Sequence, residues 1–360
     1  MGLKFKIEYR KLNFIFDAGT SRGVLNHKET WFIKAFDSNM PLVVGIGEAG
    51  PLKGLSIDDI PDFEQVLENE LTKLDGKAIP TSPDEVFTLA QSVSLHLPSV
   101  RFGIETALLD LLYGGVKKCF DNKFYQDGQS IQINGLVWMG DSALMQKRLA
   151  NKINAGFKCI KVKIGAIDLP NELQLLKLAR EAYDSSKLEL RVDANGAFSY
   201  NEAQHLLEEL HKLEVHSIEQ PIKAGQYKLM EQLCKNTPVP IALDEELIGI
   251  NTFAEKEKLL LGIRPQYIIL KPLLLGGFKS CLEWIELAER MGIGWWLTSA
   301  LESNIGLNAI CQFASSLQVT LPQGLGTGSL YDNNVDSPLE VVRDFIHYNQ
   351  SKNWEELNGD

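Results

Sequence analysis

Basic and acidic residues recur at regular intervals through the second half of this 360-residue chain. The first two, Lys161 and Lys163, lie two residues apart in the otherwise apolar segment CIKVKIGA at 159–166. If this segment is a strand, both side chains point to the same face. Interior strands seldom carry charge, so the pattern indicates a site whose charges compensate one another. Further polar residues follow at intervals of 25 to 30 residues: Asp193, Glu219, Asp244, Lys271 and Ser299.

Three of these residues, Asp193, Glu219 and Asp244, are acids. Three carboxylates that meet in one place repel one another, which raises their pKa values unless a cation neutralises them. A ligand set of oxygen atoms without His or Cys favours a hard ion such as Mg²⁺ over zinc. Glu245 and Glu246 are alternatives to Asp244 as the third ligand. We expect Asp244 to be the ligand.

The lysines suggest acid–base chemistry beside this metal. Repulsion between Lys161 and Lys163, together with a nearby cation, would lower the pKa of one lysine. Such a lysine can act as a general base at neutral pH. Lys271 would approach from the far side of the acids. Ammonium groups on both sides of a metal-held carboxylate suit removal of the proton next to that carboxylate, since the resulting negative charge is stabilised.

The elements that must position these residues begin near residue 130, where short β-rich segments alternate with helical ones. This alternation predicts parallel βαβ units. Their number favours an α/β fold of the TIM-barrel type, although a doubly wound sheet remains possible. In a barrel the side chains above would share the rim at the C-terminal strand ends, where active sites lie. The strand candidates are QINGLVW, KCIKVKIG, ELRVDAN, VHSIEQP, PIALDEEL, QYIILKP and GWWLTSAL, with a weaker eighth around QGLGTG.

The two ends of the chain have a different pattern. Residues 1–50 alternate like an antiparallel meander, and residues 56–118 resemble helices. The segment DSPLEVVRDFIHYN at 336–349 predicts one more helix. We therefore predict a first α+β domain at 1–125, a barrel domain at 126–328, and a C-terminal tail at 329–360 that returns to the first domain.

The segment GIGEAG at 45–50 matches the dinucleotide-binding pattern GxGxxG literally. Pro51, Lys53 and Gly54 follow where a phosphate-binding helix would begin, and no βαβ unit surrounds the segment. We interpret it as a turn in the antiparallel sheet.

Composition narrows the class of protein. A formal net charge of −11 argues against nucleic-acid partners, and an anionic substrate would need locally placed Lys or Arg. No apolar run approaches the roughly 20 residues that span a bilayer, so we expect no membrane partner. Widely spaced cysteines without a CxxC pair favour free thiols in a reducing cytoplasm. A homo-oligomer is compatible with these data. The cysteines are Cys119, Cys159, Cys234, Cys281 and Cys311.

Taken together, these motifs resemble the enolase superfamily over nearly the whole chain. The resemblance implies a capping domain, built from the N-terminal region and the C-terminal tail, over a (β/α)₇β barrel. It also implies that Asp193, Glu219 and Asp244 bind Mg²⁺, that Lys163 and Lys271 are the acid–base pair, and that Lys161 contacts a substrate carboxylate. The matching segments are KVK at 161–163, VDAN at 192–195, IEQP at 218–221, LDEE at 243–246 and LKP at 270–272.

Within that superfamily the barrel motifs resemble the muconate-lactonizing subgroup, and three segments are most similar to its o-succinylbenzoate synthases. Dipeptide epimerases of the subgroup usually place Asp-x-Asp at the eighth strand to hold an ammonium group, whereas this chain has Gly326, Thr327 and Gly328 there. A substrate without an ammonium group is therefore expected. The three segments are AGTSRGVLNHKETW at 18–31, SALESNIG at 299–306 and GLGTGSLYDNN at 324–334.

This resemblance implies a syn dehydration of the dianion 2-succinyl-6-hydroxy-2,4-cyclohexadiene-1-carboxylate to 2-succinylbenzoate, in menaquinone biosynthesis. Lys163 would remove the proton and then protonate the departing hydroxyl, while Lys271 stays charged. Asn195, Ser299 and Arg22 would join Lys161 in binding substrate. Two alternatives remain: an isomerase, either an N-acylamino-acid racemase or a dipeptide epimerase, and an inactive barrel retained as a binding protein.

Overall fold

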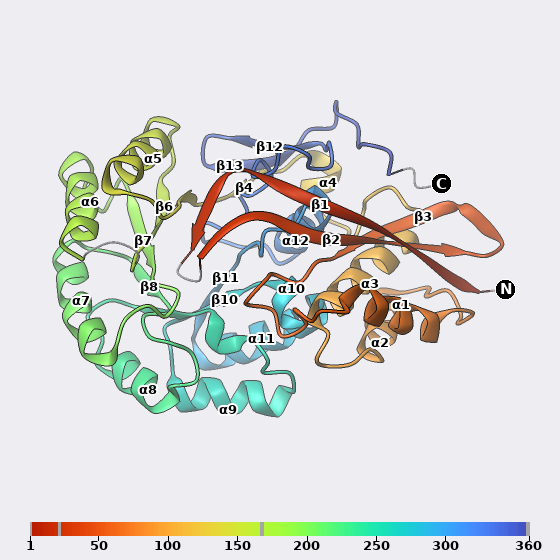
Figure 1. Ribbon diagram of the computed structural model, residues 1–360, viewed down its shortest axis with the longest axis horizontal. Helices are drawn as coiled ribbons and strands as arrows, with labels where there is room; N and C mark the ends of the chain where they lie inside the picture. Colours follow the sequence, from red (N-terminus) through yellow and green to blue (C-terminus); the bar gives the residue numbers. More distant parts are fainter. Residues whose placement is uncertain (1, 21–22, 166–168, 358–360) are drawn as a thin grey trace.

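Short parallel strands form a curved sheet that is the inner wall of a barrel (Figure 1). The computed structural model describes residues 2–20, 23–165 and 169–357. Seven strands of these residues form the sheet: β5 Gly135–Val137, β6 Cys159–Lys163, β7 Glu189–Asp193, β8 Ser217–Glu219, β9 Ile241–Leu243, β10 Tyr267–Leu270 and β11 Gly294–Leu297. They pair in chain order from β5 to β11. A doubly wound sheet would reverse its order at a switch point, so the barrel prediction is confirmed.

Backbone bridges from one further segment join the two edges of this sheet. Gln323 bridges Ile133, just before β5, and Gly324 bridges Thr298, just after β11, both in parallel. The Asn134 amide donates to the Gln323 carbonyl at 2.9 Å, and the Gly324 amide donates to the Leu297 carbonyl at 2.8 Å. The predicted weak eighth strand is therefore only two residues of pairing, but this pairing closes the ring.

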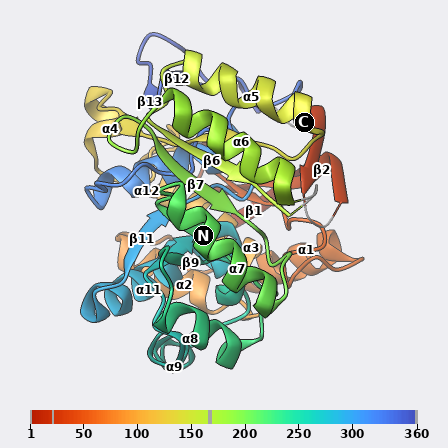
Figure 2. The same cartoon turned by 90° about the vertical axis from the view of Figure 1, so that its left-hand side faces the viewer.

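Helices cover the outer face of the sheet (Figures 1 and 2). In α7, for example, buried residues follow helical spacing from Ala203 to Leu210, and the Ser199 hydroxyl accepts the Glu202 amide to cap its first turn. The helices are α5 Ser142–Asn154, α6 Leu169–Ala182, α7 Tyr200–Lys212, α8 Tyr227–Lys235, α9 Phe253–Ile263, α10 Pro272–Leu275, α11 Gly277–Met291 and α12 Asn304–Ser316, with a 3₁₀ turn η1 at Glu245–Leu247.

The N-terminal region is an antiparallel sheet with helices packed on it, as predicted. Figure 1 shows the hairpin of β1 and β2 extending from this region toward the parallel strands. We call the region formed by these elements the cap. Its strands are β1 Leu3–Thr20, β2 Gly23–Asp37 and β3 Met40–Ala49, and its helices are α1 Phe63–Leu74, α2 Pro83–Gln91 and α3 Pro98–Leu112; a short helix α4, Lys123–Asp127, follows.

The glycine-rich segment 45–50 belongs to the antiparallel sheet, but our interpretation of it as a turn is wrong. Residues 45–49 lie inside strand β3. A Cβ atom on Gly45 would lie 2.1 Å from the Ala107 carbonyl oxygen, and one on Gly47 would lie 1.9 Å from that of Gly103. These glycines let the backbone of α3 pack directly on the strand.

The predicted helix at 336–349 is also wrong, because this segment forms a hairpin. Strand β12, Leu339–Val342, pairs with β13, Phe345–Tyr348, which also pairs with β4, Ile131–Gln132. Arg343 has φ of 55°, so a tight turn separates the strands. The β-branched residues of the segment favour strands, and their spacing also matches one face of a helix.

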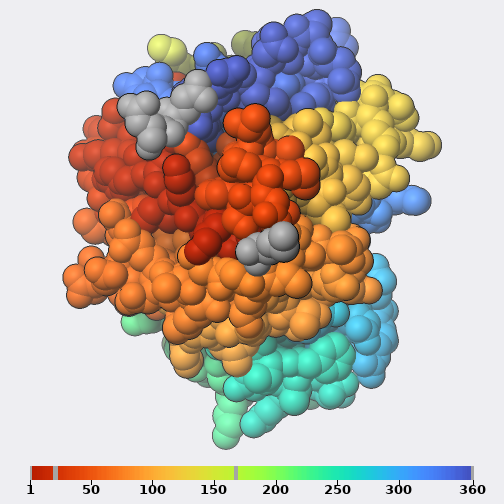
Figure 3. Space-filling model, turned by 90° about the vertical axis from the view of Figure 1, so that its right-hand side faces the viewer, coloured from red at the N-terminus to blue at the C-terminus, as the bar shows by residue number. Residues whose placement is uncertain are grey.

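The chain end returns to the cap. The Lys34 ammonium donates to the Leu357 carbonyl at 2.7 Å, and Arg10 pairs with Glu355 at 3.0 Å. Figure 3 shows the C-terminal residues in blue beside the N-terminal residues in red. The residue boundaries that we predict for the domains, the cytoplasmic location and the homo-oligomer stay predictions.

No helix within the described residues is long and apolar enough to cross a membrane. All five cysteines are buried and free.

Candidate active site

Strand register places the predicted residues at one rim of the barrel. Lys163 on β6 pairs with Asp193 on β7, and Asp193 pairs with Glu219 on β8. Residues paired in parallel strands point to the same face, which here is the barrel interior. Asp244 and Lys271 directly follow β9 and β10. In the order of the strands, the three acids therefore lie between the two lysines.

Ion pairs join these groups into one buried network. Lys163 Nζ lies 2.8 Å from Asp193 Oδ2, and Lys161 Nζ lies 2.7 Å from Glu219 Oε2 and 3.5 Å from Asp193 Oδ2. Lys271 pairs with Asp244 and lies 3.9 Å from Glu219 Oε1. The sequence-based expectation that two close lysines can be buried opposite carboxylates matches this geometry.

The pKa values reflect these contacts. Burial alone would raise the pKa of Asp193, but Lys163 and Lys161 outweigh burial and lower it. Burial alone would lower the pKa values of Lys161 and Lys271, but neighbouring carboxylates, Glu219 among them, raise both. Our expectation of a lysine with a lowered pKa therefore depends on a cation that neutralises these carboxylates.

The acids fit a metal ion in their chemistry. Oε1 of Glu219 is buried and accepts no hydrogen bond from the described residues. Burial raises the pKa of Asp244, and the charge of Lys271 opposes this rise. The charges of Glu245 and Glu219 add to it. A further positive charge nearby would therefore stabilise the ionised carboxylate of Asp244. No three acidic, His or Cys side chains are already grouped around a metal position within the described ranges; lysine ammonium groups lie between the acids instead.

The neighbouring acids have other partners. Glu246 accepts hydrogen bonds from the Gln220 side chain at 3.0 Å and the Gly225 amide at 2.7 Å. Glu245 accepts from the Asn195 side-chain amide at 3.0 Å. Asp244 is the acid of this segment that pairs with Lys271, as expected for the residue that faces the rim.

The predicted substrate-binding residues differ in their position. Asn195 accepts from Lys163 Nζ at 2.7 Å and therefore contacts the proposed base directly. The Ser299 hydroxyl donates to Glu302 at 2.6 Å and accepts from Thr327 at 2.8 Å and the Leu301 amide at 3.0 Å, so protein groups already use its capacity. Arg22 lies outside the described residues.

A cavity of about 530 Å³ lies between the rim and the cap. Lys161, Lys163, Asp193, Asn195, Lys271 and Ser299 line it from the barrel. The cap contributes Gly23, Val24 and Leu25 at the start of β2, which lie in the segment 18–31 that the family resemblance singled out. It also contributes Leu52, Lys53, Gly54 and Leu55 from a loop that the sequence did not indicate, because loops facing a cavity have no periodic pattern. On the barrel side Trp138 was missed as well.

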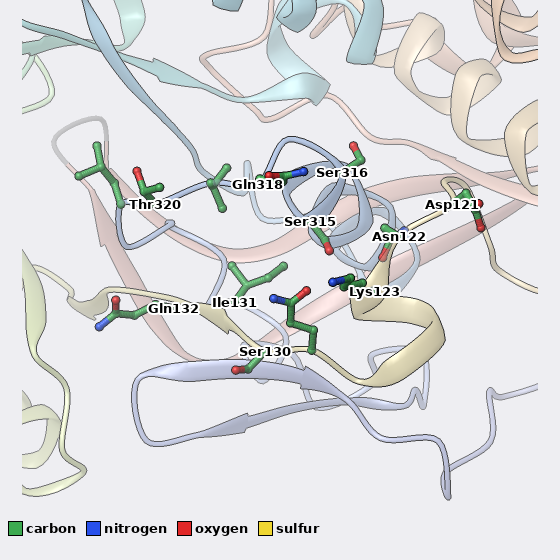
Figure 4. A pocket seen from close by; sticks show the side chains of 13 residues that line it. Asp121, Asn122, Lys123, Ser130, Ile131, Gln132, Ser315, Ser316, Gln318 and Thr320 are labelled. Carbon is green, nitrogen blue, oxygen red and sulfur yellow. The ribbon is translucent and has the colours of Figure 1, made fainter.

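A second cavity, of about 460 Å³, contains none of the predicted residues (Figure 4). Ile131 precedes β5 and Leu321 precedes the closing segment, so this cavity lies toward the N-terminal ends of the strands. Its other lining residues are Asp121, Asn122, Lys123, Gln129, Ser130, Gln132, Ser315, Ser316, Gln318, Val319 and Thr320.

Comparison with known proteins identifies the family. A family model described as enolase C-terminal domain-like matches residues 144–351, more than half of the chain. The chain belongs to the enolase superfamily.

Similar members of the enolase superfamily include an o-succinylbenzoate synthase from Desulfotalea psychrophila, 44% identical over 93% of this chain and 97% of that protein. The crystal structure of MenC from Desulfotalea psychrophila LSv54 superposes with a TM-score of 0.85 at 39% identity, covering 96% of this chain and 100% of that one. The L-Ala-D/L-Glu epimerase from Bacillus subtilis has a TM-score of 0.84 at 19% identity, covering 97% and 96%; this likeness shows the fold alone.

Proposed function

We propose that this enzyme is an o-succinylbenzoate synthase that dehydrates 2-succinyl-6-hydroxy-2,4-cyclohexadiene-1-carboxylate to 2-succinylbenzoate in menaquinone biosynthesis. The observation that carries the proposal is the 44% identity to an o-succinylbenzoate synthase over nearly the full length of both chains. The two lysines on either side of three acids supply the groups that this reaction needs.

We propose that Asp193, Glu219 and Asp244 hold Mg²⁺. The buried Glu219 Oε1 that accepts no hydrogen bond from the described residues, and the raised pKa of Asp244, support this assignment. When bound, the ion neutralises the acids, weakens their hold on the lysine protons and stabilises negative charge on substrate oxygens.

In the proposed reaction the chain's own residues move one proton. Lys163 takes the proton from the carbon that bears the ring carboxylate, and the electron pair of that C–H bond moves onto the carboxylate. That electron pair then returns to the ring and forms the double bond that completes the aromatic ring. The ring C–O bond breaks in the same step, and the Lys163 ammonium gives its proton to the departing hydroxyl on the same face, which leaves as water. Lys271 stays protonated opposite Lys163 and stabilises the negative charge. Lys161 binds a carboxylate of the substrate.

The cavity suits a substrate without an ammonium group. Among its described lining residues the one carboxylate is Asp193, which already contacts two lysines. Residues 326–328 are Gly-Thr-Gly, and the Thr327 hydroxyl donates to Ser299. An ammonium group near this segment would meet no carboxylate there. This supports a dianionic substrate over the dipeptides of the epimerases.

The test measures two reactions side by side with the purified enzyme and Mg²⁺: dehydration of the cyclohexadiene substrate, and racemisation of N-succinylamino acids. We expect efficient dehydration, and a loss of about 10² to 10⁴ in kcat for Lys163→Ala. Racemisation with negligible dehydration would refute the proposal. Mg²⁺ binding by Lys163→Ala, measured by calorimetry, controls for folding.

A further inference from the structure

A buried carboxylate in the cap reaches across to the barrel. Glu48 lies on β3 and is 0% exposed. From β2 it accepts hydrogen bonds from Thr30 Oγ1 at 2.9 Å and Lys28 Nζ at 3.4 Å. From the barrel it accepts the Ser303 amide at 2.9 Å and hydroxyl at 2.5 Å, and the Gly306 amide at 3.0 Å. One side chain thus joins the hairpin to the segment that starts α12.

Both segments that Glu48 joins extend into the wall of the active-site cavity. Strand β2 begins at residues 23–25, which line the cavity from the cap. The barrel segment that leads to Ser303 contains residues 299–301, which line it from the other side. Glu48 therefore links, a few residues away, the two segments that carry residues 23–25 and residues 299–301.

A second buried carboxylate strengthens this junction. Glu302 is 0% exposed, accepts the Ser299 hydroxyl at 2.6 Å and accepts the Ala300 amide at 2.9 Å. Burial raises the pKa of Glu302; the charge of Lys28 opposes this rise and the charge of Glu48 adds to it. Lys28, only 3% exposed, thus supplies positive charge to both carboxylates from the hairpin.

We propose that Glu48, together with Lys28, is a positioning residue that fixes the cap hairpin over the substrate and so determines substrate affinity. Glu48 touches neither substrate nor metal in this proposal; it acts through residues 23–25 at the start of β2 and through residues 299–303. The inference rests on the proposed function for its kinetic readout.

Another buried carboxylate provides a matched control. Glu105 on α3 is 1% exposed and accepts the Phe278 amide at 2.5 Å, at the start of α11. It too links cap and barrel, but neither α3 nor α11 contributes a residue to the lining of the cavity. Burial raises the pKa of Glu105 to about 8, so Glu105→Gln changes a buried hydrogen-bonding group at a different cap–barrel contact with little change of charge at neutral pH.

The experiment compares Glu48→Gln, Glu105→Gln and the wild type. We expect Glu48→Gln to raise KM about tenfold, as for loss of a charged hydrogen bond, with kcat within about threefold. Hydrogen–deuterium exchange should speed up in residues 23–30 and 299–306. Glu105→Gln should leave KM and both exchange rates unchanged. An unchanged KM and unchanged exchange in Glu48→Gln would refute the inference, as would equal effects of the two variants.

Two further measurements keep the test decisive. In Lys28→Met/Glu48→Gln/Glu302→Gln no charge of this junction stays buried, so stability should recover relative to Glu48→Gln while KM stays high. If KM recovered together with stability, Glu48 would be merely structural. A wild type that does not dehydrate the substrate would refute the proposed function, whereas the exchange comparison would still decide whether Glu48 couples the two segments.

Discussion

Asp58 offers a prediction whose size follows from the structure. It lies between β3 and α1, in the segment whose residues Leu52 and Leu55 line the active-site cavity. The side chain is 0% exposed, and Oδ2 accepts the Ser99 amide at 2.8 Å and the Ser99 hydroxyl at 2.6 Å. Oδ1 is buried and accepts no hydrogen bond from the described residues. Asp58 thus holds the loop of the cap to the start of α3.

Burial raises the pKa of Asp58 from 3.8 to about 6, although the Ser99 hydrogen bonds oppose the rise. Roughly two pKa units at about 1.4 kcal/mol each amount to about 3 kcal/mol. The folded state binds the proton more tightly than the unfolded state. Stability from this group is therefore complete below about pH 4 and falls as pH rises through about 6.

The perturbation is Asp58→Asn, which keeps an acceptor oxygen for Ser99 but cannot titrate. The assay is urea denaturation of both proteins from about pH 4 to pH 7. We expect the unfolding free energy of the wild type, minus that of the variant, to fall by about 3 kcal/mol over this range. Ser99→Ala removes a hydrogen bond that lowers the Asp58 pKa in the folded state, so the fall should become larger and extend to higher pH. A difference that stays constant, or rises with pH, would refute the reasoning.

Three further predictions concern the rim and the cavity. Lys271→Ala should lower kcat/KM for dehydration by about 10² to 10³, because this is the usual loss when one group that stabilises negative charge is removed. Product binding, measured by fluorescence titration, should be retained. A variant with wild-type activity would contradict the role of Lys271. Treatment with EDTA should abolish turnover, and added Mg²⁺ should restore it. Glu219→Gln should need a higher Mg²⁺ concentration to reach half of its maximal rate. Activity that survives chelation would contradict the metal assignment. Thr327→Asp puts a carboxylate beside Ser299, so KM for the dianion should rise about tenfold or more through repulsion; an unchanged KM would place the second carboxylate of the substrate elsewhere.

The rim could be predicted from the sequence because its rules are local. Two-residue alternation put Lys161 and Lys163 on one face, and the regular length of a βα unit put Asp193 and Lys271 at the same height as Lys163. The hairpin at 339–348 could not be predicted with the same rules, because its β-branched residues fit one face of a helix equally well. Only pairing with β4, some 200 residues earlier, decides the matter.

The cap side of the cavity depends on contacts between segments far apart in the chain. No local pattern near Leu55 indicates that it faces Lys163 across a cavity, and Leu25 was indicated only through the family resemblance of segment 18–31. Ser299 lies at the rim, but its hydroxyl forms hydrogen bonds with Glu302, Thr327 and the Leu301 amide. These hydrogen bonds depend on how the loop after β11 folds, which the sequence does not indicate. Glu48 lies in the segment 45–50, which matches GxGxxG, but its glycines allow α3 to pack on β3 instead of forming a phosphate-binding turn. The motif therefore gave no sign of the contacts of Glu48.

The closing pairs of the ring have a consequence for biosynthesis. Ile133 can form its backbone bridge only after Gln323 has been synthesised. Lys34 on β2 can form its hydrogen bond only after Leu357 has been synthesised. A nascent chain leaving the ribosome therefore exposes the open edge of β5 until Gln323 has emerged, and part of the first sheet until Leu357 has followed. A chain truncated before Gln323 should therefore keep this edge open and depend on chaperones, although every group of the rim, up to Ser299, is already present.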